Sequence, residues 1–143
     1  MKKILTLVLG MMVLACATAF ASEASSVPLD ASATQYEASA LDIQHQDGME
    51  ILRQANDITI YANDVTKKIL KVEYAKIGDS LGKVVVGDHW NFHKPTGLCI
   101  LTLNSDGVTH HTYDEADGTQ TIYATVDSIV KSITRVSSSA KAK

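Results

Sequence analysis

The sequence predicts an α+β fold in which a long N-terminal helix and a short C-terminal helix pack on one face of a small antiparallel sheet of about four to five strands. Three observations lead to this prediction. Apolar residues recur at alternating spacings of 4 and 3 positions between Met49 and Ile77, which is the period of one helical face. Short β-branched runs separated by turn residues follow Gly78, and an apolar helical pattern follows Asp127.

The predicted long helix occupies Met49–Ile77, a stretch without glycine or proline. Asp47 before it and Gly78 after it suit the two caps of a helix. An unbroken helix of this length would measure about 43 Å and would overhang strands of about 20 Å. Its apolar face therefore predicts a homodimer contact, formed by Ile51, Ala55, Ile58, Ala62, Val65, Ile69 and Val72.

Weak helix formers such as Asn56 and Asp57 leave an alternative open, in which the helix is broken and Ile58–Tyr61 is a short strand. The tetrapeptide Thr-Ile-Tyr-Ala occurs twice in the chain. We predict that Thr59–Ala62 is helical, because it lies within the helical pattern. We predict that Thr121–Ala124 is a strand, because apolar and polar residues alternate around it.

The second half of the chain has the pattern of short strands joined by turns. We predict strands at Lys83–Val86, Leu98–Leu103, Val108–Tyr113 and Thr119–Val126. If each turn closes its nearest pair, Leu103 lies opposite Val108 and Tyr113 lies opposite Thr119. The final helix begins after Asp127 and places on one face Ile129, Val130, Ile133 and Val136.

This register divides the sheet into an aliphatic face and a face rich in threonine and tyrosine. The aliphatic face is expected to be the core, and its members are Cys99, Leu101, Leu103, Val108, His110, Ile122, Ala124 and Val126. The other face is either an ordinary solvated surface or a surface for a small ligand or a protein partner. The candidate contact residues on it are His111, Tyr113, Tyr123, Thr102 and Thr109.

The N-terminus has the pattern of an export signal. Lys2 and Lys3 precede an apolar run, and Ala19-Phe20-Ala21 matches the small-x-small cleavage pattern. We expect residues 1–21 to be a signal peptide, the mature chain to lack a transmembrane helix, and the protein to be periplasmic. A lipid anchor on Cys16 is the less favoured alternative, because Leu14 stands where lipoprotein signals usually have a smaller residue.

Composition sets the domain organisation and excludes one class of partner. Residues 22–40 and 137–143 are small and polar, which predicts a flexible linker and a flexible tail around a single domain at 41–136. The chain carries 16 acidic and 13 basic residues, so we expect no nucleic-acid partner. After removal of the signal, Cys99 is the remaining cysteine, which excludes an internal disulfide.

Histidines supply an alternative function. His89 and His93 would share one face of a helix, but the β-branched run before them and Pro95 after them predict a loop or an edge strand, where these side chains would lie about 13 Å apart. A divalent zinc or copper site is therefore an alternative that requires a loop to gather His89, His93, His111 and Asp88.

The residues favour a non-catalytic function. We predict an exported binding domain of the kind found in sensors and adaptors, without a resident cofactor and dimeric through the helical face. The first alternative is a periplasmic metal-binding protein. The second is a small enzyme that uses Cys99 and His110, which the predicted register makes diagonal neighbours about 7 Å apart. We lean against catalysis because no third orienting group accompanies that pair.

Overall fold

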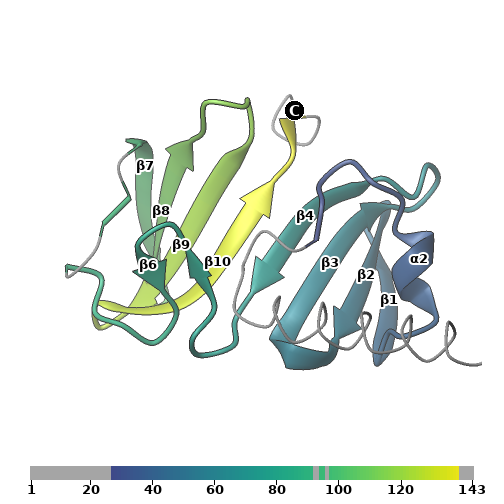
Figure 1. The fold of residues 1–143 in the computed structure, drawn as a ribbon, viewed down its shortest axis with the longest axis horizontal. Helices are drawn as coiled ribbons and strands as arrows, with labels where there is room; N and C mark the ends of the chain where they lie inside the picture. The colour runs from purple at the N-terminus through teal and green to yellow at the C-terminus, as the bar shows by residue number, and fades with distance from the viewer. Residues whose placement is uncertain (1–26, 92–93, 96, 139–143) are drawn as a thin grey trace, which may run out of the picture.

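Eight antiparallel strands form one sheet in the computed structural model, which describes residues 27–91, 94–95 and 97–138 (Figure 1). The order across the sheet is β1-β2-β3-β4-β10-β9-β8-β7. The strands of the first half are β1 (Asp42–Gln46), β2 (Met49–Gln54), β3 (Ile58–Asn63) and β4 (Ile69–Tyr74). Those of the second half are β7 (Leu98–Ser105), β8 (Val108–Asp114), β9 (Gln120–Val126) and β10 (Ile129–Val136).

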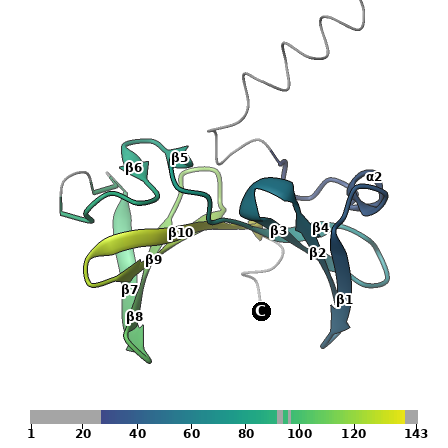
Figure 2. The ribbon, with the colours of Figure 1, turned by 90° about the horizontal axis from the view of Figure 1, so that it is seen from below.

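The remaining elements are short and lie on one side of the sheet. A separate two-stranded hairpin consists of β5 (Ser80–Leu81) and β6 (Val84–Val85), and α2 (Thr34–Glu37) is a single helical turn. A 3-10 turn, η1 (Ala55–Asp57), joins β2 to β3. Figure 2 shows that the sheet curves away from the side that carries β5, β6 and α2. This side is called the covered face. The opposite side is called the open face.

The sheet consists of two four-stranded meanders joined edge to edge at β4 and β10. Ile133 lies opposite Tyr74 and Val136 lies opposite Lys71 at this seam. Because β4 ends one meander and β10 ends the other, β3 and β9 occupy corresponding places in the two halves. Both copies of Thr-Ile-Tyr-Ala therefore lie in strands, and the predicted helical conformation of the first copy is wrong.

The predicted α+β fold is wrong, and the largest error is the long helix. The stretch Met49–Ile77 forms β2, β3 and β4, so the alternative with a strand at Ile58–Tyr61 describes this region better. Asn56 and Asp57 have φ of 64° and 57°, a left-handed conformation that no α-helix contains. Asn63 ends β3 by accepting hydrogen bonds on its side-chain oxygen from the amides of residues 65 and 66, at 2.9 and 2.8 Å.

The seven residues of the predicted helical face are consequently scattered over the hairpins. Val65 lies in a turn and is 88% exposed, whereas Ile69 and Val72 are buried in β4. Ile51 lies opposite Tyr61, so it faces the side of the sheet opposite Leu52 and Ile60. The positions Ala55, Ile58 and Ala62 fall in the 3-10 turn and in β3. No continuous apolar stripe joins these residues.

The predicted C-terminal helix is also wrong, because residues Ile129–Val136 form β10. Asp127 and Ser128 both have positive φ, 52° and 66°, and they form the tight turn that leads from β9 into β10. A bulge between Val130 and Ser132 puts Val130 and Ile133 on the same face although they are three residues apart. The bulge therefore gives these apolar side chains of a strand the three-residue spacing that is typical of a helix.

The assignment of core and surface in the second half is reversed. Ser105 lies opposite Val108 and Tyr113 lies opposite Thr121, so each hairpin is shifted by two residues from the predicted register. A shift of two preserves which side chains share a face, except at Cys99, which a bulge moves to the face of Tyr113. Of the predicted core face, Ala124 is buried, but most of the buried members belong to the face rich in threonine and tyrosine: Tyr113, Thr121, Tyr123 and Thr125. Leu101 and Leu103 are exposed.

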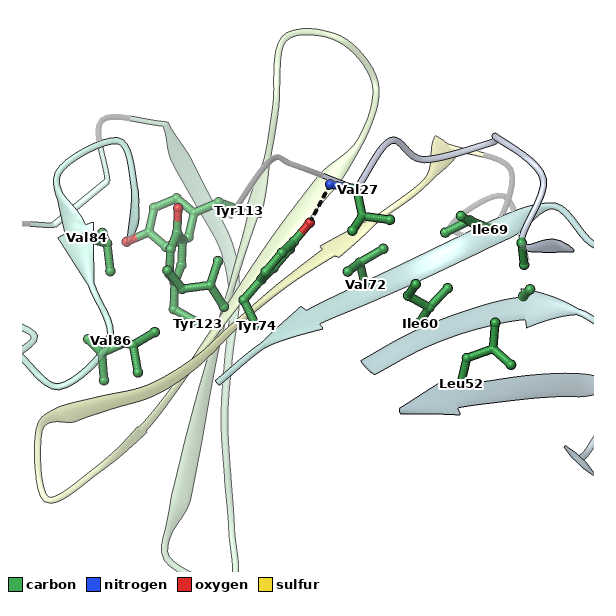
Figure 3. Close-up of a cluster of buried hydrophobic side chains, with 14 of the residues drawn as sticks. Val27, Leu52, Ile60, Ile69, Val72, Tyr74, Val84, Val86, Tyr113 and Tyr123 are labelled. Carbon is green, nitrogen blue, oxygen red and sulfur yellow. Dashed lines mark hydrogen bonds between the residues drawn. The ribbon is translucent and has the colours of Figure 1, made fainter. Parts of the chain in front are cut away.

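The core lies between the sheet and the segments that cross its covered face. Figure 3 shows Val84 and Val86 near Tyr113 and Tyr123, and it shows Val27 over β4. Further along the same face the fully buried side chains include Leu52, Ile60, Ile69, Val72, Tyr74 and Ile133. Burial of these side chains supplies the main stabilisation of the fold.

The segment before β1 takes part in this core. The backbone amide of Val27 donates a hydrogen bond to the Tyr74 hydroxyl at 3.1 Å, and Val27 and Ala33 are buried. These residues belong to the stretch 22–40 that the sequence assigns to a linker. At the other end, the amide of Ser137 donates to the carbonyl of Leu70 at 2.8 Å. The predicted signal peptide and Cys16 lie outside the described residues.

Candidate functional site

An aromatic cluster lies under the β5–β6 hairpin on the covered face. The ring of Trp90 stacks on His111 with centroids 4.3 Å apart, and it lies 5.5 Å from Tyr123. Tyr113 and Tyr123 meet edge to face at 5.6 Å. Trp90 is held in place by its backbone, because its amide donates to the carbonyl of Ser128 at 2.6 Å.

The cluster keeps its titratable groups uncharged. Burial, followed by the charges of Lys94 and His110, lowers the pKa of His111. Burial also raises the pKa of Tyr123 well above its ordinary value, and the negative charge of Glu115 adds to that shift. A neutral imidazole packed on an indole is expected to act as a core residue, not as a general acid or base near neutral pH.

The structure divides the five predicted surface residues into two groups. Tyr113 and Tyr123 are buried in the cluster, and Tyr123 also lines a cavity beside Arg135. His111 and Thr109 line a cavity of about 400 Å³, together with Trp90, Asn104, Gly107, Thr125, Asp127 and Ser128. Thr102 lies on β7, where its hydroxyl is 3.4 Å from the sulfur of Cys99.

The predicted metal residues do not converge within the described part of the chain. No group of three or more His, Cys, Asp or Glu side chains that could hold a metal ion occurs among the residues that the structure describes. His111 is stacked on Trp90, and the ring of His89 accepts a hydrogen bond from the amide of Asn91 at 3.2 Å. Asp88 pairs through its backbone with Val130, and His93 lies outside the described residues.

The residues of the predicted Cys-His pair are not neighbours. A bulge between Cys99 and Leu101 places Cys99 opposite Tyr113, whereas His110 lies opposite Leu103. Cys99 therefore shares the face of Tyr113, and His110 shares the other face. The contacts of the thiol are with the carbonyl of Leu101 and the hydroxyl of Thr102. Among the described residues, this arrangement separates Cys99 from the base that the predicted pair assigned to it, His110.

The edge strand β7 is a candidate interaction site that the sequence analysis missed. It is eight residues long, it pairs with β8 alone, and every residue in it is exposed. Its sequence, LCILTLNS, contains no charged residue. The exposed fractions of Leu98 and Leu103 are 72% and 56%, values that are high for leucine. The sequence predicts a strand here, but it places Cys99, Leu101 and Leu103 in the core and only Thr102 among the candidate contact residues.

The opposite edge of the sheet differs from β7 in length and polarity. The strand β1 has five residues, DIQHQ, and its exposed aliphatic side chain is Ile43. Proteins commonly protect edge strands by keeping them short and by placing charged or polar side chains on them. The edge at β1 fits that description, and the edge at β7 does not.

None of the helices in residues 27–91, 94–95 and 97–138 is long and apolar enough to cross a membrane. No model of a known protein family matches the chain, and no curated protein matches it. Its fold is similar to part of a crystal structure of an extracellular protein containing an SCP domain from Bacillus anthracis, with a TM-score of 0.53 and 8% sequence identity. The similarity covers 76% of this chain but 43% of that one, so the chain spans less than half of that protein's length.

Proposed function

We propose that the protein is an exported, non-catalytic interaction domain whose partner adds a strand to β7. The observation that carries this proposal is an edge strand of eight exposed residues without a charged side chain. An edge strand presents a row of unpaired amides and carbonyls, and a partner strand satisfies them while burying the apolar side chains between them.

A second copy of the chain is the partner that β7 fits best. In an antiparallel pairing with Thr102 opposite its own counterpart, Leu101 of each copy lies opposite Leu103 of the other copy. The four leucines then form one apolar cluster on the open faces, and the two threonines form a cross-strand pair on the covered faces. Two-fold symmetry closes such a contact after two copies.

The charges that flank β7 favour the same pairing. The nearest charged residues along the chain are Lys94 before the strand and Asp106 after it. Antiparallel pairing centred on Thr102 places Asp106 of one copy opposite Leu98 of the other, four residues from Lys94 of that copy, so the nearest flanking charges at each end of the shared ladder have opposite signs. Parallel pairing would bring like charges together.

Two observations support export. Lys2 and Lys3 precede an apolar run that ends in Ala19-Phe20-Ala21, which is the order of features in a secretory signal. The structural neighbour is an extracellular protein. The periplasm is the compartment that this proposal assigns to the chain.

Light scattering coupled to size exclusion, over a range of protein concentrations, tests the proposal. We expect a dimer that dissociates on dilution, and we expect the double variant Leu101→Lys, Leu103→Lys to be a monomer at every concentration. Burying a leucine fully contributes about 1.5–3 kcal/mol. These leucines are already partly buried, so about 1 kcal/mol each is lost, and the dissociation constant rises at least about 100-fold.

Ile43→Lys is the matched control, because Ile43 is an exposed aliphatic residue on the opposite edge strand. It should leave the dimer intact. A wild-type chain that stays monomeric at the highest concentration, or a dimer unaffected by the two lysines, would contradict the proposal.

A further inference from the structure

A second cavity of the covered face lies beside a partly buried arginine, Arg135. It has a volume of about 410 Å³, within the range of small-molecule sites. Its walls come from the β5–β6 turn, the segment before β7, the β8–β9 turn and the strands β9 and β10. The residues central to the argument are Arg135, Lys83, Lys94, Thr121 and Tyr123.

Arg135 lies in the middle of the sheet with little charge compensation. It pairs with Thr121 of β9 on one side and with Val72 of β4 on the other, and its side chain is 18% exposed. Its ion-pair partner among the described residues is Asp117, 3.9 Å away and 62% exposed. Asp117 already accepts two hydrogen bonds from Thr119, at 3.0 and 2.6 Å. The guanidinium has five donors, so it can hold a further acceptor in addition to Asp117.

Two further donors line the same cavity. The hydroxyl oxygen of Thr121 is buried and has no hydrogen-bond partner among the residues that the structure describes. Burial raises the pKa of Tyr123, so its phenol stays protonated and able to donate near neutral pH. Figure 3 shows the hydroxyls of Tyr113 and Tyr123 directed away from the sheet, on the side of the hairpin that carries Val84.

The charges around the cavity favour an anion. Lys83, Lys94 and Arg135 line it, against Glu115 and Asp117. A carboxylate or phosphate group accepts two parallel hydrogen bonds from a guanidinium, which is the strongest arrangement for such a pair. The volume leaves room for an organic body of modest size beside the charged group.

We infer that this cavity binds a small organic anion through a carboxylate or phosphate group held by Arg135, with Lys83 and Lys94 at its mouth. The site shares Lys94 with the flank of β7, but Arg135, Lys83 and Thr121 lie away from that strand, so the binding activity is additional and does not rest on dimer formation. The positive charges of the three basic residues and the buried hydroxyls of Thr121 and Tyr123 favour an anionic ligand that accepts hydrogen bonds. Leu81, Pro95 and the ring of Tyr123 provide the apolar wall.

Titration of ¹⁵N-labelled protein with inorganic phosphate and, separately, with succinate tests the inference by NMR. We expect saturable shifts of the amides of residues 119–123 and 133–136 with at least one probe. The relative response to the two probes distinguishes phosphate from carboxylate recognition. Binding should also raise the unfolding temperature in proportion to the logarithm of probe concentration.

Arg135→Lys keeps the charge but loses the planar fork, and it should weaken binding at least about tenfold. Arg135→Gln should abolish binding, and Lys83→Gln should weaken it. The control Arg53→Gln removes an exposed arginine of β2 and should leave binding unchanged. Equal affinity in Arg135→Lys and the wild type, or shifts that fail to saturate with both probes, would overturn the inference.

Discussion

Paired truncations on opposite faces of the second meander test which face carries the core. Tyr123 is 3% exposed and its ring contacts Trp90 and Tyr113, whereas Leu103 is 56% exposed. Truncation of a large buried side chain leaves a cavity and costs about 3–5 kcal/mol. Tyr123→Ala should therefore lower the free energy of unfolding by about 4 kcal/mol. Leu103→Ala should lower it by less than about 1 kcal/mol.

Urea denaturation followed by far-UV circular dichroism measures both changes. Protein concentrations must be low enough to keep the chain monomeric, because pairing at β7 would add a concentration-dependent contribution from Leu103. Tyr123→Phe keeps the ring and serves as the mild control, and Tyr123→Leu is the substitute if the alanine variant does not fold. If Leu103→Ala destabilised the fold as much as Tyr123→Ala, the aliphatic face would be the core. That result would contradict the burial of the face rich in threonine and tyrosine.

Two further predictions concern pH and turn stability. Because the pKa of His111 is lowered in the folded state, the unfolded chain binds more protons as the pH falls below about 6.5, so the free energy of unfolding should decline from pH 7 to pH 5. His111→Gln should flatten this decline in urea midpoints measured across that range, and an unchanged slope would exclude His111 as its source. Asn63→Ala removes an acceptor of two backbone hydrogen bonds and should lower the free energy of unfolding by about 1 kcal/mol. A change below the error of urea denaturation would mean that those bonds contribute nothing.

Part of the architecture could be read from the sequence because the relevant signals are local. The turn at Asp106-Gly107 has φ of 54° and 81°, the mirror-image geometry that an Asp-Gly pair favours. The same signal occurs at Asp47-Gly48, with φ of 53° and 77°, so this pair forms a hairpin turn and Asp47 is not the helix cap that the sequence predicts. An Asp-Gly pair occurs in each half of the chain, and each pair indicates a hairpin there.

The helical interpretation failed because hairpins can imitate a helical period. Alternation within β3 gives Ile58, Ile60 and Ala62 on the covered face, and the turn to β4 then adds Ile69 and Val72. Ile58 and Ala62 are four positions apart along the chain, and Ile69 and Val72 are three apart, so these pairs match the spacing of a helical face. The weak helix propensity of residues 56 and 57 indicated the break in the helical pattern correctly, because both residues adopt a left-handed turn.

The core face could not be derived from residue polarity. Threonine and tyrosine form the buried side of β8 and β9 because Trp90, Val84 and Val86 cover them from a segment that is distant in sequence. That contact follows from the tertiary placement of the hairpin, which no local pattern encodes. The exposed leucines of β7 appear as a candidate interface once this placement is known.

Disulfide crosslinking across β7 tests directly whether two copies of the chain pair through this strand. In a Cys99→Ser background, cysteines are placed singly at positions 100, 102 and 104, and each variant is oxidised at a protein concentration at which light scattering shows the wild-type chain as a dimer. Position 102 should crosslink to its counterpart fastest, because the proposed symmetry axis passes between the two Thr102 residues and brings their Cβ atoms to about 4.5–5.5 Å. Equal and slow crosslinking at all three positions, or a chain that remains uncrosslinked, would contradict strand addition at β7 by a second copy.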